Sequence, residues 1–502
     1  MKTLKTTIAI ILANILFSCN MDINVNPNEM VTTTAGQLLP AAILKAAALD
    51  NTDMNLLGAF WSGQWGKAYD VTGSYVIGSL LVSTTSTLDQ VASYGITSRF
   101  ANDIWEISYL NLYNLSLIEK EQGLVAGPFY VGMAKILKGY TFLRLVDFYN
   151  NIPFSEALDP SNPAPIYDDG ETVYKGAIAL ITEGIAHIKQ GGIAPAADDI
   201  LFGGDMDQWA RFGNTLKLRA LIRMSEIEQD AYIREQLGII QQEGSGFLLA
   251  DAFVNPGFST AASNQLNPFW NGYYRNFTGS VTTLNQGLRP TRYLLSFYAE
   301  HNDPRMKQIY NTVNGQYAGV VLGQLTADPS QNFGVTSSFK GPLDNDSQGG
   351  GLVKSATQPL LFFSAAESYF LQAEAAQRGW ISDGNAEQYY LDSVRTSFAY
   401  LGVPSAIFQS YVAQPSVRFN NSLERIIEQK WLAMNGIDGA EAWNDYRRLA
   451  LPDAPGSVAV SEGIRPYRLL YPESEVNANP EQVNRQQVTS GTDYHNRVFW
   501  QP

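Results

Sequence analysis

Apolar residues recur at steps of three and four positions along several stretches of the chain, which is the spacing of one face of an α-helix. Over residues 170–189 this spacing places on one face Tyr174, Ala177, Ile178, Ile181, Ile185 and Ile188. Asp168 and Glu171 precede that face with the spacing of a capping box, which marks a helix start. The same spacing predicts further helices over 131–149, 207–227, 363–379, 386–398 and 441–449, and one that begins at Leu423.

The helix predicted over 131–149 has a clear end in the sequence. Asn150 follows it, and asparagine tolerates the left-handed conformation that ends many helices. Shortly afterwards Ile152 precedes Pro153, and a residue before proline disfavours the helical region. We therefore expect Asn150 to cap this helix in a left-handed conformation.

The predicted helices come in adjacent pairs, and a stack of helix hairpins is typical of tetratricopeptide-like arrays, although no strict repeat period is visible. We predict a mostly α fold, in which a tetratricopeptide-like scaffold of helix pairs covers about 99–230 and 360–450. The length prior of about 150 residues per domain suggests several domains. Continuous helix pairs favour instead a single domain over residues 19–502.

The segment 251–351 differs from this scaffold. It is rich in Asn, Gly, Ser, Gln and aromatic residues, and it shows helical spacing only near 292–298. Loops of this length in a compact protein are usually functional or disordered, and a high density of aromatic residues favours order. We predict that 251–351 forms long ordered loops, a ligand-facing insert laid over the helices.

The first nineteen residues have the order of a secretion signal. Lys2 and Lys5 precede an uncharged stretch over 6–17, which is too short to span a bilayer, and Ser18 and Cys19 follow. The four residues that end at Cys19 resemble the lipobox of bacterial lipoproteins, in which the cysteine is acylated after cleavage. We predict a signal peptide over 1–18 and lipidation of Cys19; the alternative is an ordinary thiol in a discarded leader.

Composition and charge narrow the possible functions. The chain is 45% hydrophobic and 16% charged, which is typical of a globular protein, and no stretch after Cys19 holds eighteen consecutive apolar residues. Its formal net charge of -14 makes nucleic acid an unexpected partner and disfavours acidic ligands. A single cysteine excludes an intramolecular disulfide and a zinc site built from cysteines.

The sequence shows no pattern of catalytic or metal-binding residues. The three histidines, His187, His301 and His495, are scattered, and the HExxH, GxSxG and Walker A motifs are missing. We therefore expect no cofactor, no metal and no catalytic residues.

Six motifs, in order along the chain, resemble those of the SusD-like (SusD/RagB) nutrient-binding lipoproteins of the Bacteroidetes outer membrane. They lie at 22–28, 134–138 with 147–154, 209–212 with 216–219, 366–375, 429–431 with 441–448, and 471–475. Two positions depart from the family pattern: Asn150 stands where glycine is common, and Leu449-Ala450 replaces the usual Thr-Gly.

The resemblance implies a mostly helical body with four tetratricopeptide-like helix pairs. It further implies a protein anchored by acyl chains (palmitate) in the outer membrane, facing the cell exterior. There it would form a lid on a TonB-dependent transporter and capture oligosaccharides or, in some members of the family, peptides.

Two clusters of aromatic residues are candidates for ligand contact, because aromatic rings match the apolar faces of sugars while Asn, Gln and Asp satisfy hydroxyls. The N-terminal cluster contains Trp61, Trp65, Tyr69 and Tyr75. The central cluster contains Phe269, Trp270, Asn271, Tyr273, Tyr274 and Phe277. We favour Trp270, Tyr273 and Tyr274, because Trp61 and Trp65 lie four apart and could instead form one core-facing side of a helix.

Three alternatives stay open. Asp445, Arg447 and Arg448 beside Trp443 form either an ion-binding cluster or, as we favour, a buried structural network, because arginine forks pair buried carboxylates well. A lipid-anchored glycoside hydrolase would need two carboxylates across a cleft, and the 48 acidic residues supply many candidates. A purely structural role within a surface complex is the third class.

Overall fold

The computed structural model describes residues 34–502 except 73–86, 121–126, 345–350, 383 and 489–490. This part of the chain is mostly helical, which confirms the predicted fold class. None of its helices is both long and apolar enough to cross a bilayer. The predicted signal peptide and Cys19 lie outside the described residues.

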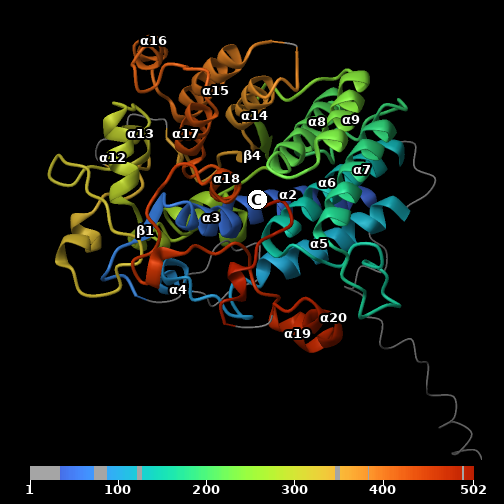
Figure 1. Ribbon diagram of the computed structural model, residues 1–502, viewed down its shortest axis with the longest axis horizontal. Coiled ribbons are helices and arrows are strands. Elements are labelled where there is room, and N and C mark those ends of the chain that lie inside the picture. Colours follow the sequence, from blue (N-terminus) through green and yellow to red (C-terminus); the bar gives the residue numbers. More distant parts are fainter. Residues whose placement is uncertain (1–33, 73–86, 121–126, 345–350, 383, 489–490) are drawn as a thin grey trace, which may run out of the picture.

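The scaffold consists of four successive helix pairs, as the resemblance implied. They are α6 (Gly127–Tyr149) with α7 (Gly170–Ile188), α8 (Met206–Arg223) with α9 (Asp230–Glu243), α14 (Ala365–Gln377) with α15 (Ala386–Leu401), and α17 (Leu423–Met434) with α18 (Gly439–Leu449). Figure 1 shows the first two pairs together on one side of the molecule and the later pairs beside them. Residues 244–364, which separate the second pair from the third, leave the scaffold and return to it.

The helix boundaries differ from the predicted ones where capping decides them. Asp169, not Asp168, caps α7 by accepting a hydrogen bond from the Thr172 backbone N–H at 2.9 Å. The carboxylate of Asp168 instead accepts hydrogen bonds from the backbone of the preceding loop, at Phe154 and Ser155. Asn150 has φ 67°, so the predicted left-handed cap of α6 is confirmed.

Two other boundaries were predicted wrongly. Helix α8 ends at Arg223 rather than at Ile227, because the chain turns directly after it. Phe363 belongs to a strand, and α14 begins only after Ser364, whose side chain caps it.

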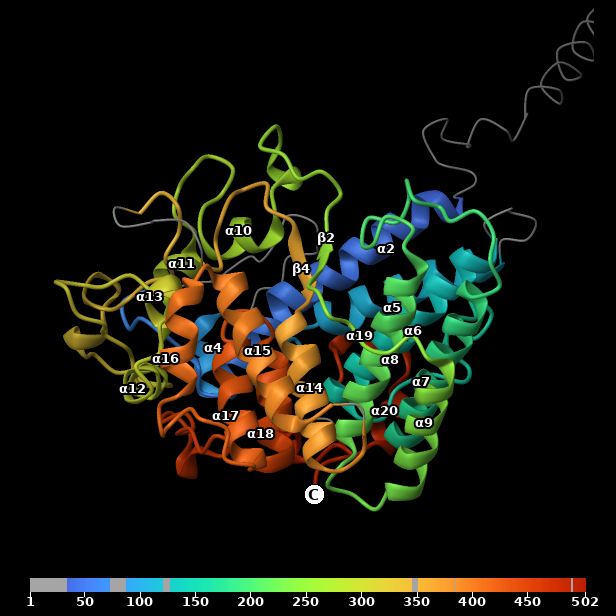
Figure 2. The ribbon, with the colours of Figure 1, turned by 90° about the horizontal axis from the view of Figure 1, so that it is seen from above.

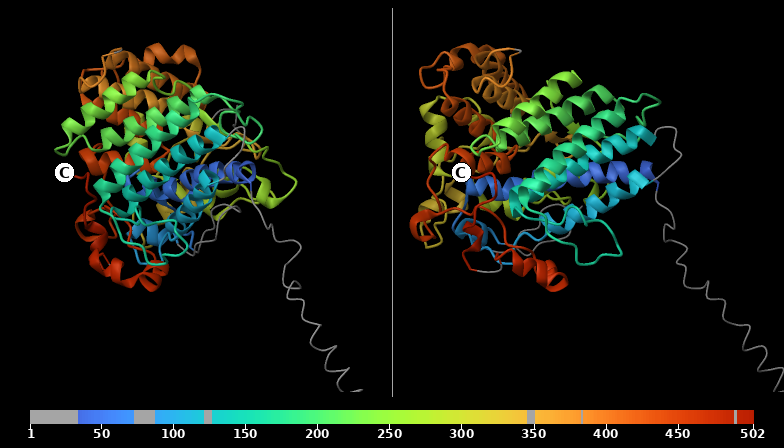
Figure 3. Two further views of the ribbon diagram at one scale, coloured as in Figure 1. Left: turned by 90° about the vertical axis from the view of Figure 1, so that its right-hand side faces the viewer. Right: turned by 45° about the vertical axis from the view of Figure 1, so that its right-hand side comes forward.

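Three helices of more than six residues near the N-terminus were missed. They are α2 (Ala35–Leu49), α3 (Asn55–Trp61), joined to α2 by the π-helical turn η2 (Asp50–Met54), and α5 (Asp103–Lys120). Every residue of η2 and α3 is buried, so these segments have no polar face to give the helical spacing. Figure 3 shows the N-terminal helices, in blue, below the green helices of the scaffold.

The N-terminal core packs directly on the last helix pair. Helices α3 and α18 cross at Gly58 and Gly439, where the two backbones touch so closely that neither position has room for a Cβ atom. Next to this crossing the rings of Trp61 and Trp443 meet edge to face with centroids 4.9 Å apart. The close contact therefore depends on glycine in both helices.

The insert 251–351 lies to one side of the scaffold (Figure 2). Two small antiparallel sheets connect it to the rest: β1 (Trp65–Lys67) pairs with β3 (Leu288–Pro290), and β2 (Ala252–Val254) pairs with β4 (Leu360–Phe363). Helix α12 (Arg292–Glu300) covers the predicted helical stretch. Three short helices were not predicted: α10 (Pro268–Tyr273), α11 (Thr283–Gly287) and α13 (Met306–Ile309).

The remaining elements are short. The α-helices are α4 (Leu88–Ser93), α16 (Phe408–Val412), α19 (Glu473–Ala478) and α20 (Pro480–Arg485). Single 3-10 turns occupy Ser263–Gln265, Pro329–Gln331, Phe333–Val335, Ser405–Ile407, Ser461–Gly463 and Asp493–His495.

Candidate functional site

The insert presents a surface held in place by the buried side chain of Tyr274. Its hydroxyl donates to Asp344 Oδ1 at 3.0 Å and accepts from the Leu343 backbone N–H at 3.1 Å. The amide of Asn311 donates to the other carboxylate oxygen of Asp344 at 2.9 Å. Arg275 lies over the Tyr274 ring, 5.2 Å from its centroid. These contacts fasten the segment 339–344 to the end of α10.

A second set of contacts joins the insert to the N-terminal part of the chain. Arg289 in β3 donates to Thr336 Oγ1 at 2.9 Å and to the Phe333 carbonyl at 3.1 Å. The Phe333 backbone N–H donates to Asp70 Oδ1 at 2.8 Å. The structure therefore places Tyr69 and Asp70 beside the insert, so the two predicted regions meet although about 200 residues separate them in sequence. We call the surface formed by 69–70, 268–287 and 307–344 the loop face.

Both longer segments of the loop face, 268–287 and 307–344, carry exposed apolar side chains. They are Phe277, Val281, Leu325, Phe333, Val335 and Leu343, and the exposed fraction reaches 46% for Phe277 and 64% for Leu343. Single exposed apolar residues are ordinary, but several on one surface mark an interaction site. The loop face is therefore suited to a ligand with apolar surface of its own.

A cleft of about 280 Å³ opens in the loop face. It is lined by Lys307, Gln308, Tyr310, Asn311, Thr312, Tyr317 and Lys340. The cleft thus combines the half-buried ring of Tyr317 with amide, hydroxyl and ammonium groups, and its volume lies near the lower end for a small-ligand site. Burial raises the pKa of Tyr317, so its phenol stays protonated and keeps its hydrogen-bond donor. Asn311 links the cleft to the contacts of Tyr274.

The aromatic residues predicted in the central cluster form the floor under this surface. Phe269, Trp270, Tyr273 and Tyr274 are all buried, and Asn271 is half-buried. Asn267 caps α10, which packs Trp270 on Tyr274 with ring centroids 4.8 Å apart. Tyr273 and Tyr274 both point inward, because this short helix turns both toward the core. Phe277 alone of the cluster projects into solvent.

The N-terminal cluster is divided between the core and the loop face. Trp65 is buried, its Nε1 donates to Asn435 Oδ1 at 2.8 Å, and its ring lies 5.7 Å from that of Tyr273. Trp61 belongs to the core at the α3–α18 crossing. The interpretation of both tryptophans as core residues is confirmed, but they do not share a helix face, because α3 ends at Trp61. Tyr69 is half-buried, and Tyr75 lies outside the described residues.

Sequence reasoning missed the residues of the cleft. Lys307 and Gln308 belong to α13, and Asn311, Thr312 and Tyr317 follow it closely in sequence. Their mixture of amide, hydroxyl and aromatic side chains was a usable signal, but it is weaker than a run of tryptophan and tyrosine.

The chain also contains a buried network of charges, centred on Glu441 of α18. Arg223 and Arg144 contact Glu441 Oε1 at 2.7 and 2.8 Å, and Arg144 also pairs with Asp50 at 3.2 Å and with Asp438. Burial alone would raise the pKa of Glu441, but the neighbouring arginines hold that pKa well below its usual range. The network joins η2, α6, α8 and α18.

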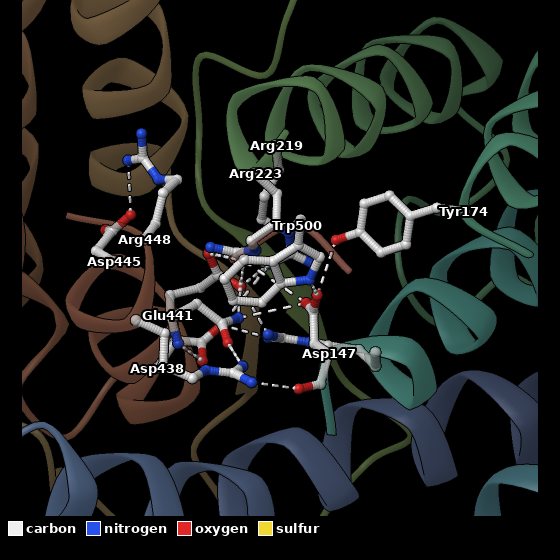
Figure 4. Close-up of polar contacts among 12 residues, drawn as sticks. Asp147, Tyr174, Arg219, Arg223, Asp438, Glu441, Asp445, Arg448 and Trp500 are labelled. Atoms are coloured by element: carbon white, nitrogen blue, oxygen red, sulfur yellow. Dashed lines mark hydrogen bonds and ion pairs between the residues drawn. The ribbon is translucent and has the colours of Figure 1, made fainter. Parts of the chain in front are cut away.

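Two further branches extend from this centre (Figure 4). Tyr174 and Trp500 both point at Asp147 Oδ1, at 2.8 and 3.0 Å, which fixes α7 and the C-terminal segment to α6. Asp445 pairs with Arg448 at 2.9 Å and with Lys430 at 2.8 Å.

Arg447, the other predicted arginine, lies 3.5 Å from the centroid of the Trp443 ring and donates to backbone carbonyls. Burial of Asp445, Arg447 and Arg448 confirms the structural interpretation of this motif. Across the described ranges, no group of three or more His, Cys, Asp or Glu side chains is arranged to hold a metal ion.

Two buried carboxyls outside this network make stability depend on pH. Burial raises the pKa of Asp53 to about 6 and that of Asp103 to about 7. Between the unfolded pKa near 4 and these values, the folded protein keeps protons that the unfolded chain has released. The free energy of unfolding should therefore fall as the pH rises from about 4 to about 7, by up to about 1.4 kcal/mol per pH unit for each retained proton.

Urea unfolding at a series of pH values measures this dependence. The double variant Asp53→Asn, Asp103→Asn is the control, and its profile should be flatter than that of the parent protein. A free energy of unfolding that stays constant or rises across this window in the parent protein would contradict the raised pKa values of Asp53 and Asp103. Glu441 does not contribute, because its lowered pKa places its titration below the window, but burial also raises the pKa of Asp50 to about 7, so the profile of the double variant should be flatter without becoming flat.

Comparison with known proteins gives one family and many similar folds. Residues 27–472 match the model of the SusD-like family described as "Starch-binding associating with outer membrane". A solved chitin-binding protein is 22% identical, with a TM-score of 0.74, over 93% of this chain and 99% of that one. No curated protein matched the sequence.

Two further solved structures have the same fold. A SusD homologue from Bacteroides uniformis is 23% identical, with a TM-score of 0.70, over 93% of this chain and 99% of its own. A chitin-binding SusD homologue from Flavobacterium johnsoniae is 19% identical, with a TM-score of 0.70, over 92% and 98% of the two chains.

Proposed function

Because the chain belongs to the SusD-like family, we propose that it captures oligosaccharides at the bacterial surface and delivers them to a TonB-dependent outer-membrane transporter. The observation that carries this proposal is the family match, which extends over 27–472 and whose description is starch binding at the outer membrane. Two proteins of the same fold are described as chitin-binding. Both descriptions point to a glycan as the class of ligand.

The loop face is the proposed ligand site. Its cleft offers amide, hydroxyl and ammonium groups for sugar hydroxyls, and Tyr317 and Phe277 offer rings for the apolar faces of a sugar. The buried aromatic residues Trp270, Tyr273 and Tyr274 support this surface from below. In this proposal they have a positioning role, and the residues above them contact the ligand directly.

Binding without hydrolysis is the activity that this site favours. A glycosidase needs two carboxylates placed on either side of the scissile bond. The described residues that line the cleft include no aspartate or glutamate. Asp344 lies nearby, but Tyr274 and Asn311 already occupy its oxygens at 3.0 and 2.9 Å.

The proposed location follows from the leader sequence. Lipidation of Cys19 would place the folded domain, which is described from Thr34 onward, at the outer membrane. A single acyl chain binds a membrane reversibly, whereas the several chains of a lipoprotein give lasting attachment. Labelling with radioactive palmitate, with Cys19→Ala as the unlabelled control, tests this part of the proposal.

Removing an aromatic side chain from the loop face should weaken oligosaccharide binding. We expect Tyr317→Ala and Phe277→Ala each to raise the Kd roughly tenfold, because each removes a ring that covers the sugar, a change of about 1.4 kcal/mol. Isothermal titration calorimetry of residues 20–502 with an oligosaccharide that the parent protein binds measures this change.

The matched control is Ile193→Ala. Ile193 is an apolar residue that is 72% exposed in the loop between α7 and α8 and does not belong to the loop face, so its removal should leave the Kd unchanged. Unchanged affinity in both loop-face variants, with the fold intact by circular dichroism, would remove the loop face as the site.

A further inference from the structure

A second cavity lies between successive helix pairs of the scaffold, apart from the loop face. It has a volume of about 590 Å³, and we call it the inter-pair cavity. Its walls come from α8, α9, the segment 244–249 and the turn that joins α14 to α15. Figure 2 shows α9 and α14 on the side of the scaffold opposite α10. The cavity is therefore a separate place from the proposed glycan site.

The inter-pair cavity exists because side chains do not fill the space between the two pairs. Helix α8 packs on α14, and α15 packs on α14. Gly238 in α9 and Gly379 in the turn after α14 both line the cavity, and a Cβ atom at either position would meet no other atom within 4 Å. The outer walls thus carry no side chains at the points where larger ones would close the gap.

Two of the residues that line this cavity are arginines that form no ion pair with a described carboxylate. Arg211 is half-buried in α8 and Arg234 is exposed in α9, and no ion pair among the described residues includes either of them. The described lining contains no aspartate or glutamate. In a chain with a net charge of -14, two arginines that line a cavity without a lining carboxylate give it a local positive charge that favours an anion.

The rest of the lining suits a sugar. Trp380, Tyr389 and Phe247 supply half-buried aromatic rings, and Gln241 and Ser245 supply uncharged hydrogen-bonding groups. Guanidinium groups bind carboxylates through paired hydrogen bonds, while aromatic rings cover the apolar faces of a sugar ring. The volume lies within the range of small-ligand pockets.

We propose that the inter-pair cavity is a second carbohydrate site, for sugar residues that carry a carboxylate, as in a uronic acid oligosaccharide. Arg211 and Arg234 bind the carboxylates, and Trp380 covers a sugar face. This inference rests on the proposed role in oligosaccharide capture, and it adds a site that selects acidic glycans. Neutral oligosaccharides bind instead at the loop face, which has exposed apolar residues.

The test compares trigalacturonate with a neutral trisaccharide of the same sugar, galactotriose, by calorimetry on residues 20–502. We expect trigalacturonate to bind, and Arg234→Gln and Arg211→Gln each to weaken its binding tenfold or more, because each removes a charged hydrogen-bonding group. Arg234 is exposed, so Arg234→Gln should fold normally even if Arg211→Gln does not. Arg485→Gln, at an exposed arginine of α20, is the matched control and should bind as the parent does.

Loop-face variants separate this inference from the proposed function. Tyr317→Ala should leave trigalacturonate binding unchanged while it weakens neutral oligosaccharides. Loss of trigalacturonate binding in Tyr317→Ala, with full binding in Arg234→Gln, would place both ligands at the loop face and overturn the second site. If the parent protein does not bind trigalacturonate, the second site is also overturned, whatever the neutral sugars do. A glutamate-rich peptide that binds in the inter-pair cavity more tightly than trigalacturonate would overturn it as well.

Discussion

Replacing Glu441 with alanine should lower the free energy of unfolding by about 3–5 kcal/mol, because it leaves buried arginines without their shared carboxylate. Glu441 is fully buried and accepts from Arg223 and Arg144 at 2.7 and 2.8 Å. Arg219 lies 3.7 Å from the same oxygen. Urea unfolding followed by tryptophan fluorescence and circular dichroism measures the change.

Two variants calibrate this result. Glu441→Gln keeps the shape and a hydrogen-bond acceptor but removes the charge, so its loss should be smaller than that of Glu441→Ala. Glu481→Ala removes one partner of an exposed i,i+4 pair with Arg485 and should cost less than about 1 kcal/mol. A loss for Glu441→Ala no larger than that for Glu481→Ala would show that the network does not hold the helices together.

Replacing Gly439 with alanine should also destabilise the protein, by about 1–3 kcal/mol, because the added methyl group overpacks the α3–α18 crossing. The new Cβ would lie 2.9 Å from Ala59 Cα and even closer to two other backbone atoms of α3, Ala59 N and Asn55 O. Since backbone atoms rather than flexible side chains block the space, the two helices must move apart. Thermal unfolding and urea unfolding report the loss.

The matched control is Gly238→Ala, a glycine inside helix α9 with no atom within 4 Å of the new methyl group. Alanine has the higher helix propensity by about 1 kcal/mol, so this variant should be as stable as the parent or more stable. Equal effects of the two substitutions would contradict a specific role for the α3–α18 contact.

The sequence predicted the scaffold helices that have one apolar and one polar face. Helix α7 is the clearest example, because its buried residues follow the steps of three and four while the positions between them face solvent. Helix α3 could not be found in this way, since all of its residues are buried and periodicity disappears. Boundaries failed where local side-chain chemistry decides, as at Asp169, which caps α7 in place of its neighbour.

The candidate site could be predicted as a region but not as a set of contacts. The aromatic residues at 269–277 directed attention to the insert, but the number of aromatic residues does not say which way their side chains point. Tyr273 and Tyr274 turn inward because Asn267 starts a short helix, and that turn depends on contacts with residues far along the chain, such as Thr52 and Asp344. The meeting of Asp70 with Phe333 likewise joins segments that no local pattern connects.

Oligosaccharide capture at the loop face is tested most simply by calorimetric titration of residues 20–502 with a panel of plant, host and microbial oligosaccharides and mixed peptides. Chromatography of each mixture afterwards shows whether a product has formed. We expect heat of binding with at least one oligosaccharide, no product, and a Kd that is roughly tenfold higher in Tyr317→Ala. Release of shorter sugars would establish an enzyme, and binding of peptides alone would assign the protein to peptide capture. Either result would contradict oligosaccharide capture at the loop face.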